Sequence, residues 1–199
     1  MKESSKRAFR IWYNLMAAIA FVVVCLVHRP KFTGKEHLPD GASVLCCNHT
    51  KWYDPILIGR AFWPGRPIRY MAKDELFRNQ LVAFFLYRIG MFPVVRGSAD
   101  ISAVKKAVHF LEEGDAVLIF PEGTRTKTDG EVRPKGGAVK IAQLAGVSVV
   151  PIYISKKRSV WKRIPVIIGD PFRIDSNITD HQEQARVLMD RIYALREAL

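Results

Sequence analysis

The sequence predicts an α/β fold, with a central mostly parallel or mixed β-sheet flanked by helices. Short apolar runs of strand length recur along the chain, and the stretches between them carry apolar residues at spacings of three and four. Strands that alternate with helices in this way are typical of a largely parallel or mixed sheet. The length of 199 residues suits one domain of this class. The content of 49% hydrophobic and 25% charged residues excludes a disordered or collagen-like chain.

The first predicted strand is the short apolar run at residues 42–47 (ASVLCC). Asp54-Pro55 has the form of a helix N-cap followed by a first-turn proline. A helix is therefore expected from this point to about Arg60. Residues 68–72 (IRYMA) are expected to form the second strand.

The middle of the chain continues the alternation. Asp74 is expected to cap a very apolar helix that ends near Arg88, and a short strand follows at 92–95. Ser98 is expected to cap the next helix, at 99–113, whose apolar residues recur at spacings of three and four.

The last third of the chain alternates in the same way. Thr179 with Gln182 forms a capping box, which marks the start of a final helix. The elements expected here are a strand at 116–120, a helix at 137–145 ended by Gly146, strands at 147–154 and 164–168, and the last helix up to Leu199.

Residues 11–27 have the composition of a membrane segment and are apolar except for Asn14. As a helix this stretch would reach about 26 Å, slightly less than the roughly 30 Å of a bilayer's hydrocarbon core. Basic residues flank it on both sides, which disfavours translocation of either end. We therefore expect residues 1–30 to anchor the chain on the cytoplasmic face of the cell membrane. A single span, a buried core helix and a cleaved signal peptide are the alternatives.

The charge of the chain points to a polyanionic partner. Lys and Arg number 31 against 19 Asp and Glu, a formal net charge of +12. Such a balance suits nucleic acid, an anionic membrane or a phosphorylated substrate. Nucleic acid is not expected, because no RNP-like aromatic motif, zinc finger or basic zipper is present. No metal is expected either, because the histidines are scattered, the three cysteines show no zinc spacing and no H-E-x-x-H occurs.

The segment 48–54 (NHTKWYD) carries polar residues that packing does not require. It lies between a predicted strand and a predicted helix, the edge at which open α/β sheets bind ligands. Across such a corner His49 and Asp54 can meet. The carboxylate would then fix the tautomer of the imidazole and raise the basicity of its other nitrogen. The alternative is a loop histidine that is hydrogen-bonded to a helix-capping aspartate.

The segment 120–126 (FPEGTRT) follows the predicted strand 116–120 directly. Gly123 allows a ligand to approach the backbone, and the guanidinium of Arg125 offers a fork for a phosphate. Glu122 could orient this arginine. The alternative is a polar turn with a surface ion pair.

Together these two segments resemble the glycerolipid acyltransferases, the PlsC family. The family pattern is Asn-His-x-x-x-x-Asp followed about 70 residues later by Phe-Pro-Glu-Gly-Thr-Arg. Residues 90–96 (GMFPVVR) resemble the family's second block, which ends in an acceptor-binding arginine, and 150–152 (VPI) resemble its fourth. Lys73 and residues 135–138 (KGGA) also look like family positions. The resemblance covers about residues 30–170, with one difference at Lys51, where the family often has serine.

The resemblance implies a glycerolphosphate acyltransferase-like fold, with residues 31–199 as the acyltransferase catalytic domain. It also implies transfer of a fatty acyl group from acyl-CoA or acyl carrier protein to 1-acyl-sn-glycerol 3-phosphate (lysophosphatidic acid), giving phosphatidic acid in phospholipid biosynthesis. His49 is the expected general base and Asp54 its partner. No cofactor is expected beyond the thioester co-substrate. The residues expected to bind the substrate are Lys73, Arg96, Glu122, Gly123, Thr124 and Arg125.

The lipid bilayer is an expected partner, because acceptor and product are lipids. A basic cluster at 156–163, around Trp161, could bind anionic headgroups, dock an acidic acyl carrier protein or be a solvated loop. Two other functions stay open: the same chemistry on another lysophospholipid or on glycerol 3-phosphate, and a non-enzymatic basic protein that binds membranes. A serine hydrolase is not expected, because no G-x-S-x-G is present.

Overall fold

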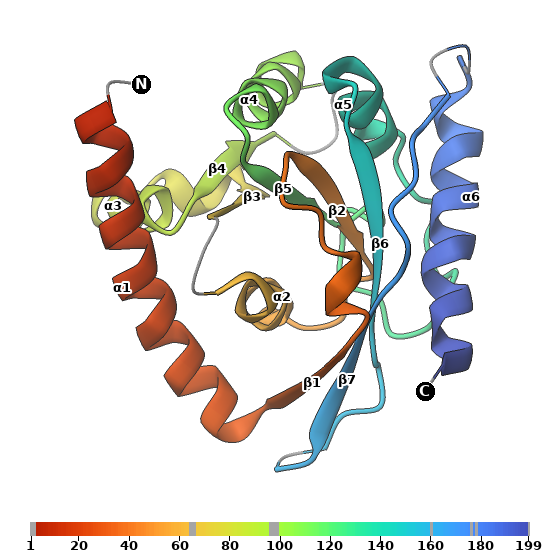
Figure 1. The fold of residues 1–199 in the computed structure, drawn as a ribbon, viewed down its shortest axis with the longest axis horizontal. Coiled ribbons are helices and arrows are strands. Elements are labelled where there is room, and N and C mark those ends of the chain that lie inside the picture. The colour runs from red at the N-terminus through yellow and green to blue at the C-terminus, as the bar shows by residue number, and fades with distance from the viewer. Residues whose placement is uncertain are drawn as a thin grey trace.

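Seven strands form one mixed sheet in the order β1-β7-β6-β2-β5-β3-β4 (Figure 1). The computed structural model describes residues 3–63, 67–95, 100–159, 161–175, 177 and 179–198. The strands from β6 to β4 run parallel to their neighbours, β7 is antiparallel to β6, and β1 is parallel to β7. The predicted α/β class is confirmed. The strands are β1 (Arg29–Thr33), β2 (Ser43–Cys47), β3 (Ile68–Lys73), β4 (Met91–Val94), β5 (Ala116–Ile119), β6 (Ser148–Ile154) and β7 (Arg163–Ile168).

Helices cover both faces of the sheet (Figure 1). Successive residues of β2 alternate between two apolar cores: Leu45 belongs to the core under α1 and α2, and Val44 to the core under α4, α5 and α6. This alternation follows from the two-residue period of a strand. The helices are α1 (Glu3–Val27), α2 (Asp54–Phe62), α3 (Gln80–Arg88), α4 (Ile101–Glu112), α5 (Gly137–Ala145) and α6 (His181–Ala194).

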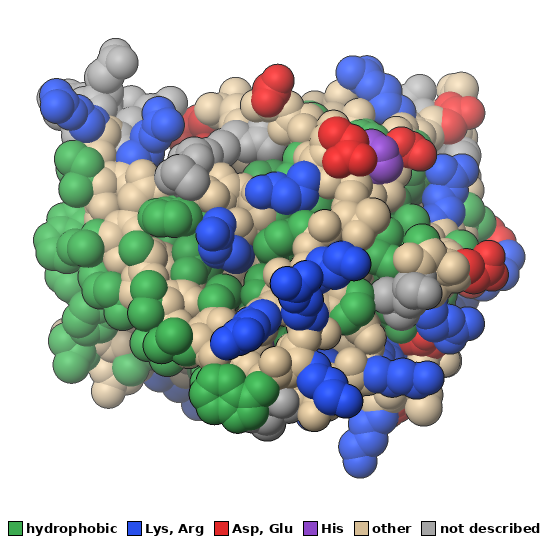
Figure 2. Space-filling model, turned by 60° about the horizontal axis from the view of Figure 1, so that its bottom comes forward, with side chains coloured by type: hydrophobic (Ala, Val, Ile, Leu, Met, Phe, Trp, Pro, Cys, Tyr) green, Lys and Arg blue, Asp and Glu red, His purple; other side chains and the backbone are tan. Residues whose placement is uncertain are grey.

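The N-terminal helix α1 has two apolar faces with different surroundings. Tyr13, Ala17, Phe21 and Val24 recur at helical spacing and are buried against the rest of the core. The opposite face is exposed, and Figure 2 shows apolar side chains along this side of the molecule. Arg7–Val27 is long and apolar enough to cross a membrane by length and composition. The exposed side chains are Ile11, Trp12, Leu15, Ile19, Val22, Val23 and Leu26.

Residues 74–88, predicted as one helix, form two elements. A short 3-10 turn covers Asp74–Phe77, and α3 begins only at Gln80. The break occurs because the side chain of Asn79 caps α3, accepting hydrogen bonds from the backbone N–H groups of Leu81 and Val82 at 3.0 and 3.1 Å. The helix contacts α1 and exposes most of its apolar side chains, Phe84 and Phe85 among them.

Two other predicted helix starts were wrong. Asp100 caps α4 by accepting from the N–H of Ala103 at 2.9 Å, and the predicted cap, Ser98, lies outside the described residues. Asp180 caps α6 by accepting from the N–H groups of Gln182 and Glu183, both at 3.0 Å. The predicted capping box with Thr179 is therefore replaced by an aspartate one residue later. In both helices the observed cap is the acidic residue directly before the first helical turn.

Candidate active site

The two polar segments found in the sequence meet at one edge of the sheet. β2 and β5 are parallel neighbours, so their carboxyl ends lie side by side, and the segments 48–54 and 120–126 follow these ends. A backbone hydrogen bond from Thr126 to the carbonyl of His49, 2.8 Å long, joins the two segments. This is the edge at which ligands bind in open α/β sheets.

Asn48 fixes the end of β2. Its side chain is fully buried and accepts from the N–H of Ile154 at 2.8 Å while it donates to the carbonyl of the same residue at 3.0 Å. This pair of bonds attaches the end of β2 to the end of β6. The backbone that carries His49 is thereby held in one position, which a catalytic side chain requires.

His49 and Asp54 make the contact that their spacing allows. Nδ1 of His49 lies 3.1 Å from Oδ2 of Asp54, and the imidazole stacks on the ring of Phe120 with 4.1 Å between centroids. The contact leaves Nε2 of His49 as the nitrogen available to a substrate, because it has no hydrogen-bond partner among the described residues. A histidine held in this way can take a proton from a hydroxyl group.

The sequence predicted Asp54 as the N-cap of α2, but Asp54 does not cap this helix. It is the first residue of the helix, and its Oδ2 accepts from the backbone N–H groups of Thr50 and Lys51, which precede it, at 2.7 and 2.8 Å. The side chain is fully buried. Burial alone would raise the pKa of Asp54, but the bond to His49, the charge of Arg158 and the two backbone donors together lower that pKa below its ordinary value. The carboxylate is therefore ionised at neutral pH.

Arg158 is a part of the site that the sequence analysis missed. Its Nη1 lies 2.5 Å from Oδ1 of Asp54, and its Nη2 donates to the hydroxyl of Thr50 at 2.9 Å. The side chain is only 4% exposed, and its Nε donates to the carbonyl of Ser155 at 2.7 Å. The carboxylate of Asp54 is thus held on one oxygen by Arg158 and on the other by His49. The sequence signals for this residue were its membership of the basic cluster at 156–163 and its place just after a strand that ends at the same edge.

Glu122 supports the backbone of His49, and its described hydrogen bonds do not reach the side chain of Arg125, which lies in the same segment as Glu122. Oε2 of Glu122 accepts from the backbone N–H of His49 at 2.6 Å. Oε1 accepts from the hydroxyls of Thr126 and Tyr193 at 2.8 and 2.9 Å. Within the part of the chain that the structure describes, no hydrogen bond or ion pair joins Glu122 to Arg125. The side chain therefore orders the backbone of His49 and, through Thr126, the loop that carries Arg125. A direct role of Glu122 in orienting Arg125 stays a prediction.

The turn after β5 presents cations to solvent beside this site. Gly123 has a φ of +65° and lies under Lys135, so that a Cβ there would be 3.0 Å from Cε of that lysine. Thr124 and Arg125 are exposed. Glycine is required here because the positive φ and the close lysine both disfavour a side chain. Arg125 and Lys135 lie on the same loop, between β5 and α5, and the contact of Lys135 with Gly123 brings both cations near the edge that carries His49.

Of the two other predicted binding residues, Lys73 and Arg96, the structure describes Lys73. Lys73 is the last residue of β3 and forms an ion pair with Glu75. Both side chains are 43% exposed, so water screens this pair and a phosphate can compete with Glu75. Arg96 lies outside the described residues, two positions after the end of β4.

The basic cluster at 156–163 is divided by the fold. Besides Arg158, Lys156 also points inward, pairing with Asp129 at 3.0 Å and donating to Thr126 at 3.1 Å. Trp161 remains 65% exposed. The cluster is therefore in part a set of internal contacts around the site. Among the described residues, no group of three or more His, Cys, Asp and Glu side chains is placed to hold a metal ion.

A histidine–carboxylate pair on a sheet edge, next to a loop with exposed cations, can serve as a general base beside an anionic substrate. Comparison with known proteins gives the class. The family profile named Acyltransferase matches residues 29–155, and this chain belongs to that family.

Individual relatives agree with the family. A 1-acyl-sn-glycerol-3-phosphate acyltransferase of Bacillus subtilis is 37% identical over 195 residues, covering 94% of this chain and 92% of its own. A lyso-ornithine lipid O-acyltransferase of Pseudomonas aeruginosa is 31% identical over 77% of this chain and 55% of its own. The crystal structure of PlsC from Thermotoga maritima, a 1-acyl-sn-glycerophosphate acyltransferase, matches with a TM-score of 0.67 at 19% identity, over 100% of this chain and 83% of that one. This structural likeness shows a shared fold.

Proposed function

We propose that this acyltransferase moves a fatty acyl group from acyl-CoA or acyl carrier protein to the free hydroxyl of 1-acyl-sn-glycerol 3-phosphate, forming phosphatidic acid for phospholipid biosynthesis. The observation that carries the proposal is the pairing of His49 with Asp54 at a sheet edge that also presents Arg125. The name of the Bacillus subtilis relative, which aligns over nearly the whole chain, supports the acceptor.

His49 is the general base of the proposed reaction, acting through Nε2. It takes the proton of the glycerol hydroxyl while the hydroxyl oxygen attacks the carbonyl carbon of the thioester. The carbon–sulfur bond then breaks, and the thiolate leaves with the proton that His49 returns. Asp54 accepts a hydrogen bond from the N–H at Nδ1 of His49 throughout and stabilises the imidazolium. General-base help of this kind is worth roughly 10²–10⁴-fold in rate.

Direct attack fits the site better than an acyl-enzyme on a cysteine. Cys46 and Cys47 end β2 beside His49, but both are fully buried. Burial raises the pKa of each thiol, most strongly through desolvation, so neither supplies a thiolate at neutral pH. A thioester is already activated, and a hydroxyl needs only a base to attack it.

The phosphate of the acceptor is held by cations around the same edge. Arg125 offers a bidentate fork. Lys73 is the last residue of β3, and Arg96 comes two positions after β4 in the sequence. Lys135, packed on Gly123, adds a further positive charge to the loop of Arg125. Gly123 and Thr124 give the phosphate access to the backbone of that loop.

The enzyme works from the cytoplasmic face of the cell membrane, with α1 and α3 in contact with lipid. Both helices expose apolar side chains, and they lie next to one another (Figure 1). A helix that lies in the interface buries such a face among headgroups and acyl chains. The acceptor, itself a membrane lipid, then reaches His49 without leaving the bilayer completely.

A second acceptor is the alternative, because one relative carries the name of an acyltransferase for a lyso-ornithine lipid. The experiment is acyl transfer by the purified full chain, with His49→Ala as the blank. Lysophosphatidic acid, glycerol 3-phosphate and lyso-ornithine lipid are each offered with acyl-CoA and with acyl carrier protein. Transfer to lysophosphatidic acid at the highest kcat/KM supports the proposal. A higher kcat/KM for another of these acceptors would make that molecule the proposed acceptor in place of lysophosphatidic acid. No transfer to any of them contradicts the proposed function.

A further inference from the structure

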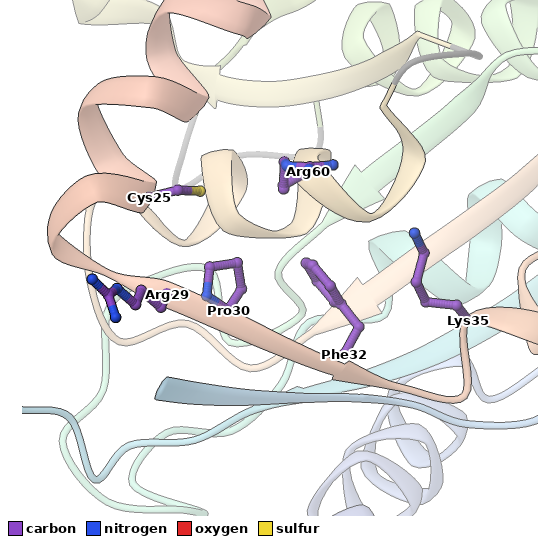
Figure 3. Close-up of a pocket in the computed structure, with 6 residues that line it drawn as sticks. All are labelled: Cys25, Arg29, Pro30, Phe32, Lys35 and Arg60. Carbon is purple, nitrogen blue, oxygen red and sulfur yellow. The ribbon is translucent and has the colours of Figure 1, made fainter. Parts of the chain in front are cut away.

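A second group of cations lies apart from the His49 loop, on the side of the sheet covered by α1 and α2. Figure 3 shows a pocket of about 360 Å³ between the end of α1, the strand β1 and the helix α2. Three of its lining residues, Arg29, Lys35 and Arg60, are cationic. The other three are Cys25, Pro30 and Phe32.

These cations differ from the buried cations elsewhere in the fold, because no described carboxylate pairs with them. Arg60 donates to the carbonyl of Trp63 at 3.3 Å and lies over the ring of that residue. Lys35 lies over the ring of Phe32, 5.7 Å from its centroid. Arg69, by contrast, pairs with Asp115 at 2.6 Å. Three like charges around one cavity repel each other, and an anion between them relieves this repulsion.

The pocket continues into an apolar surface. Cys25 lines it from the last turn of α1. Val22, three residues before Cys25, is 60% exposed, and Leu26, four residues after Val22, is 63% exposed. Residues three and four apart lie side by side on a helix. A phosphate among the cations therefore has an exposed apolar strip beside it. In Figure 2, basic side chains likewise adjoin the apolar side of the molecule.

We propose that this pocket binds the phosphate of an anionic membrane lipid, whose acyl chains lie along the exposed face of α1. It is a second lipid site, distinct from the acceptor site. Arg60 lies six residues beyond Asp54 on α2. The pocket is therefore displaced from the His49–Asp54 pair by about 9 Å along the axis of this helix. That the bound phosphate belongs to a membrane lipid rests on the membrane attachment proposed above. That the pocket binds an anion depends on neither membrane attachment nor acyl transfer.

Cys25 supplies a readout that is independent of activity. It is partly exposed, while Cys46 and Cys47 are fully buried, so a thiol reagent added to the folded protein reacts at Cys25. Burial raises the pKa of Cys25 and Arg60 lowers it in part, which keeps the thiol neutral and its labelling slow enough to follow. The labelling rate is measured with phosphatidylcholine vesicles, with the same vesicles containing phosphatidic acid, and with inorganic phosphate alone.

We expect phosphatidic acid to slow labelling of Cys25 in a saturable manner. Lys35→Gln and Arg60→Gln should each raise the half-protecting lipid concentration by about tenfold, as the loss of one charge-assisted contact predicts. Lys31→Gln is the matched control, because it removes the same charge from β1 at a residue that does not line the pocket. It should change that concentration by less than about twofold.

Three outcomes overturn the proposal. Equal slowing by pure phosphatidylcholine shows that the bilayer merely covers Cys25. Equal protection of Cys25 by inorganic phosphate, without lipid, shows that the pocket binds an anion but does not select a lipid. An equal effect of all three substitutions shows that only net charge matters. None of these results depends on acyl transfer, so a failure here is distinct from a failure of the proposed reaction.

Discussion

Replacing Arg158 by methionine tests how the site holds its carboxylate. Asp54 is fully buried and Arg158 is 4% exposed, and the two are joined at 2.5 Å. Removing one partner of a buried ion pair costs about 3–5 kcal/mol. Asp54 keeps the bonds of its Oδ2 to His49, Thr50 and Lys51. We therefore expect the lower end of that range, a loss of about 3 kcal/mol in the free energy of unfolding at neutral pH.

The pH dependence of this loss has a definite sign. The pKa of Asp54 in the folded chain lies below its ordinary value. Its ionised form therefore stabilises the fold above the unfolded pKa of about 3.9, and this stabilisation disappears as the pH falls through the folded pKa. In Arg158→Met the carboxylate lacks its cation, so the difference between the two proteins should be present at neutral pH and shrink below about pH 4.

The assay is urea unfolding of the full chain in detergent across this pH range, with acyl transfer measured in parallel. Arg186→Met is the matched control. Arg186 pairs with Glu183 on the surface of α6 and is 61% exposed, so water screens this pair and its loss should change the free energy of unfolding much less than the loss of Arg158. Arg158→Met with no larger loss than this control, or with a loss that does not change with pH, would refute the assigned role of Arg158.

Three further predictions concern catalysis, acceptor binding and membrane attachment. His49→Ala should lower kcat by about 10²-fold or more while the chain stays folded; retention of more than about a tenth of the activity contradicts the role of general base. Arg125→Ala should raise the KM for lysophosphatidic acid about tenfold or more, and a defect confined to the acyl donor would reverse that assignment. Val23→Glu, on the exposed face of α1, should reduce co-sedimentation with vesicles at an unchanged melting temperature. Ala17→Glu, on the buried face of the same helix, should instead lower that temperature. Equal binding of the wild type and Val23→Glu to vesicles argues against lipid contact through this face.

Local patterns predicted the corner of His49 and Asp54, because the strand, the turn and the helix that form it are continuous in sequence. Arg158 could not be found in this way. It reaches Asp54 across 104 residues, through the parallel pairing of β2 with β6, and no short-range pattern encodes that pairing. The strand β1 was missed for a different reason. Two of its five residues, Arg29 and Lys31, are cations on its exposed side, so the segment does not form an apolar run.

The two faces of α1 could not be separated from the sequence either. Residues on its buried and exposed sides are almost equally apolar, so no periodic contrast marks which side packs on the core. Only the fold shows that Phe21 is buried while Val22 and Val23 face outward. The division into an anchor at 1–30 and a catalytic domain at 31–199 stays a prediction. Deleting the anchor would remove part of the core together with the exposed apolar face.

The hydrogen bond from Tyr193 to Glu122 has a consequence for the order in which the enzyme matures. Tyr193 belongs to α6, and its hydroxyl lies 2.9 Å from the carboxylate that holds the backbone of His49. Translation delivers α6 after every strand of the sheet and after both polar segments of the site. A nascent chain can therefore assemble its sheet on the ribosome while the histidine still lacks one of its supports. Full catalytic competence is then acquired only when α6 emerges and docks.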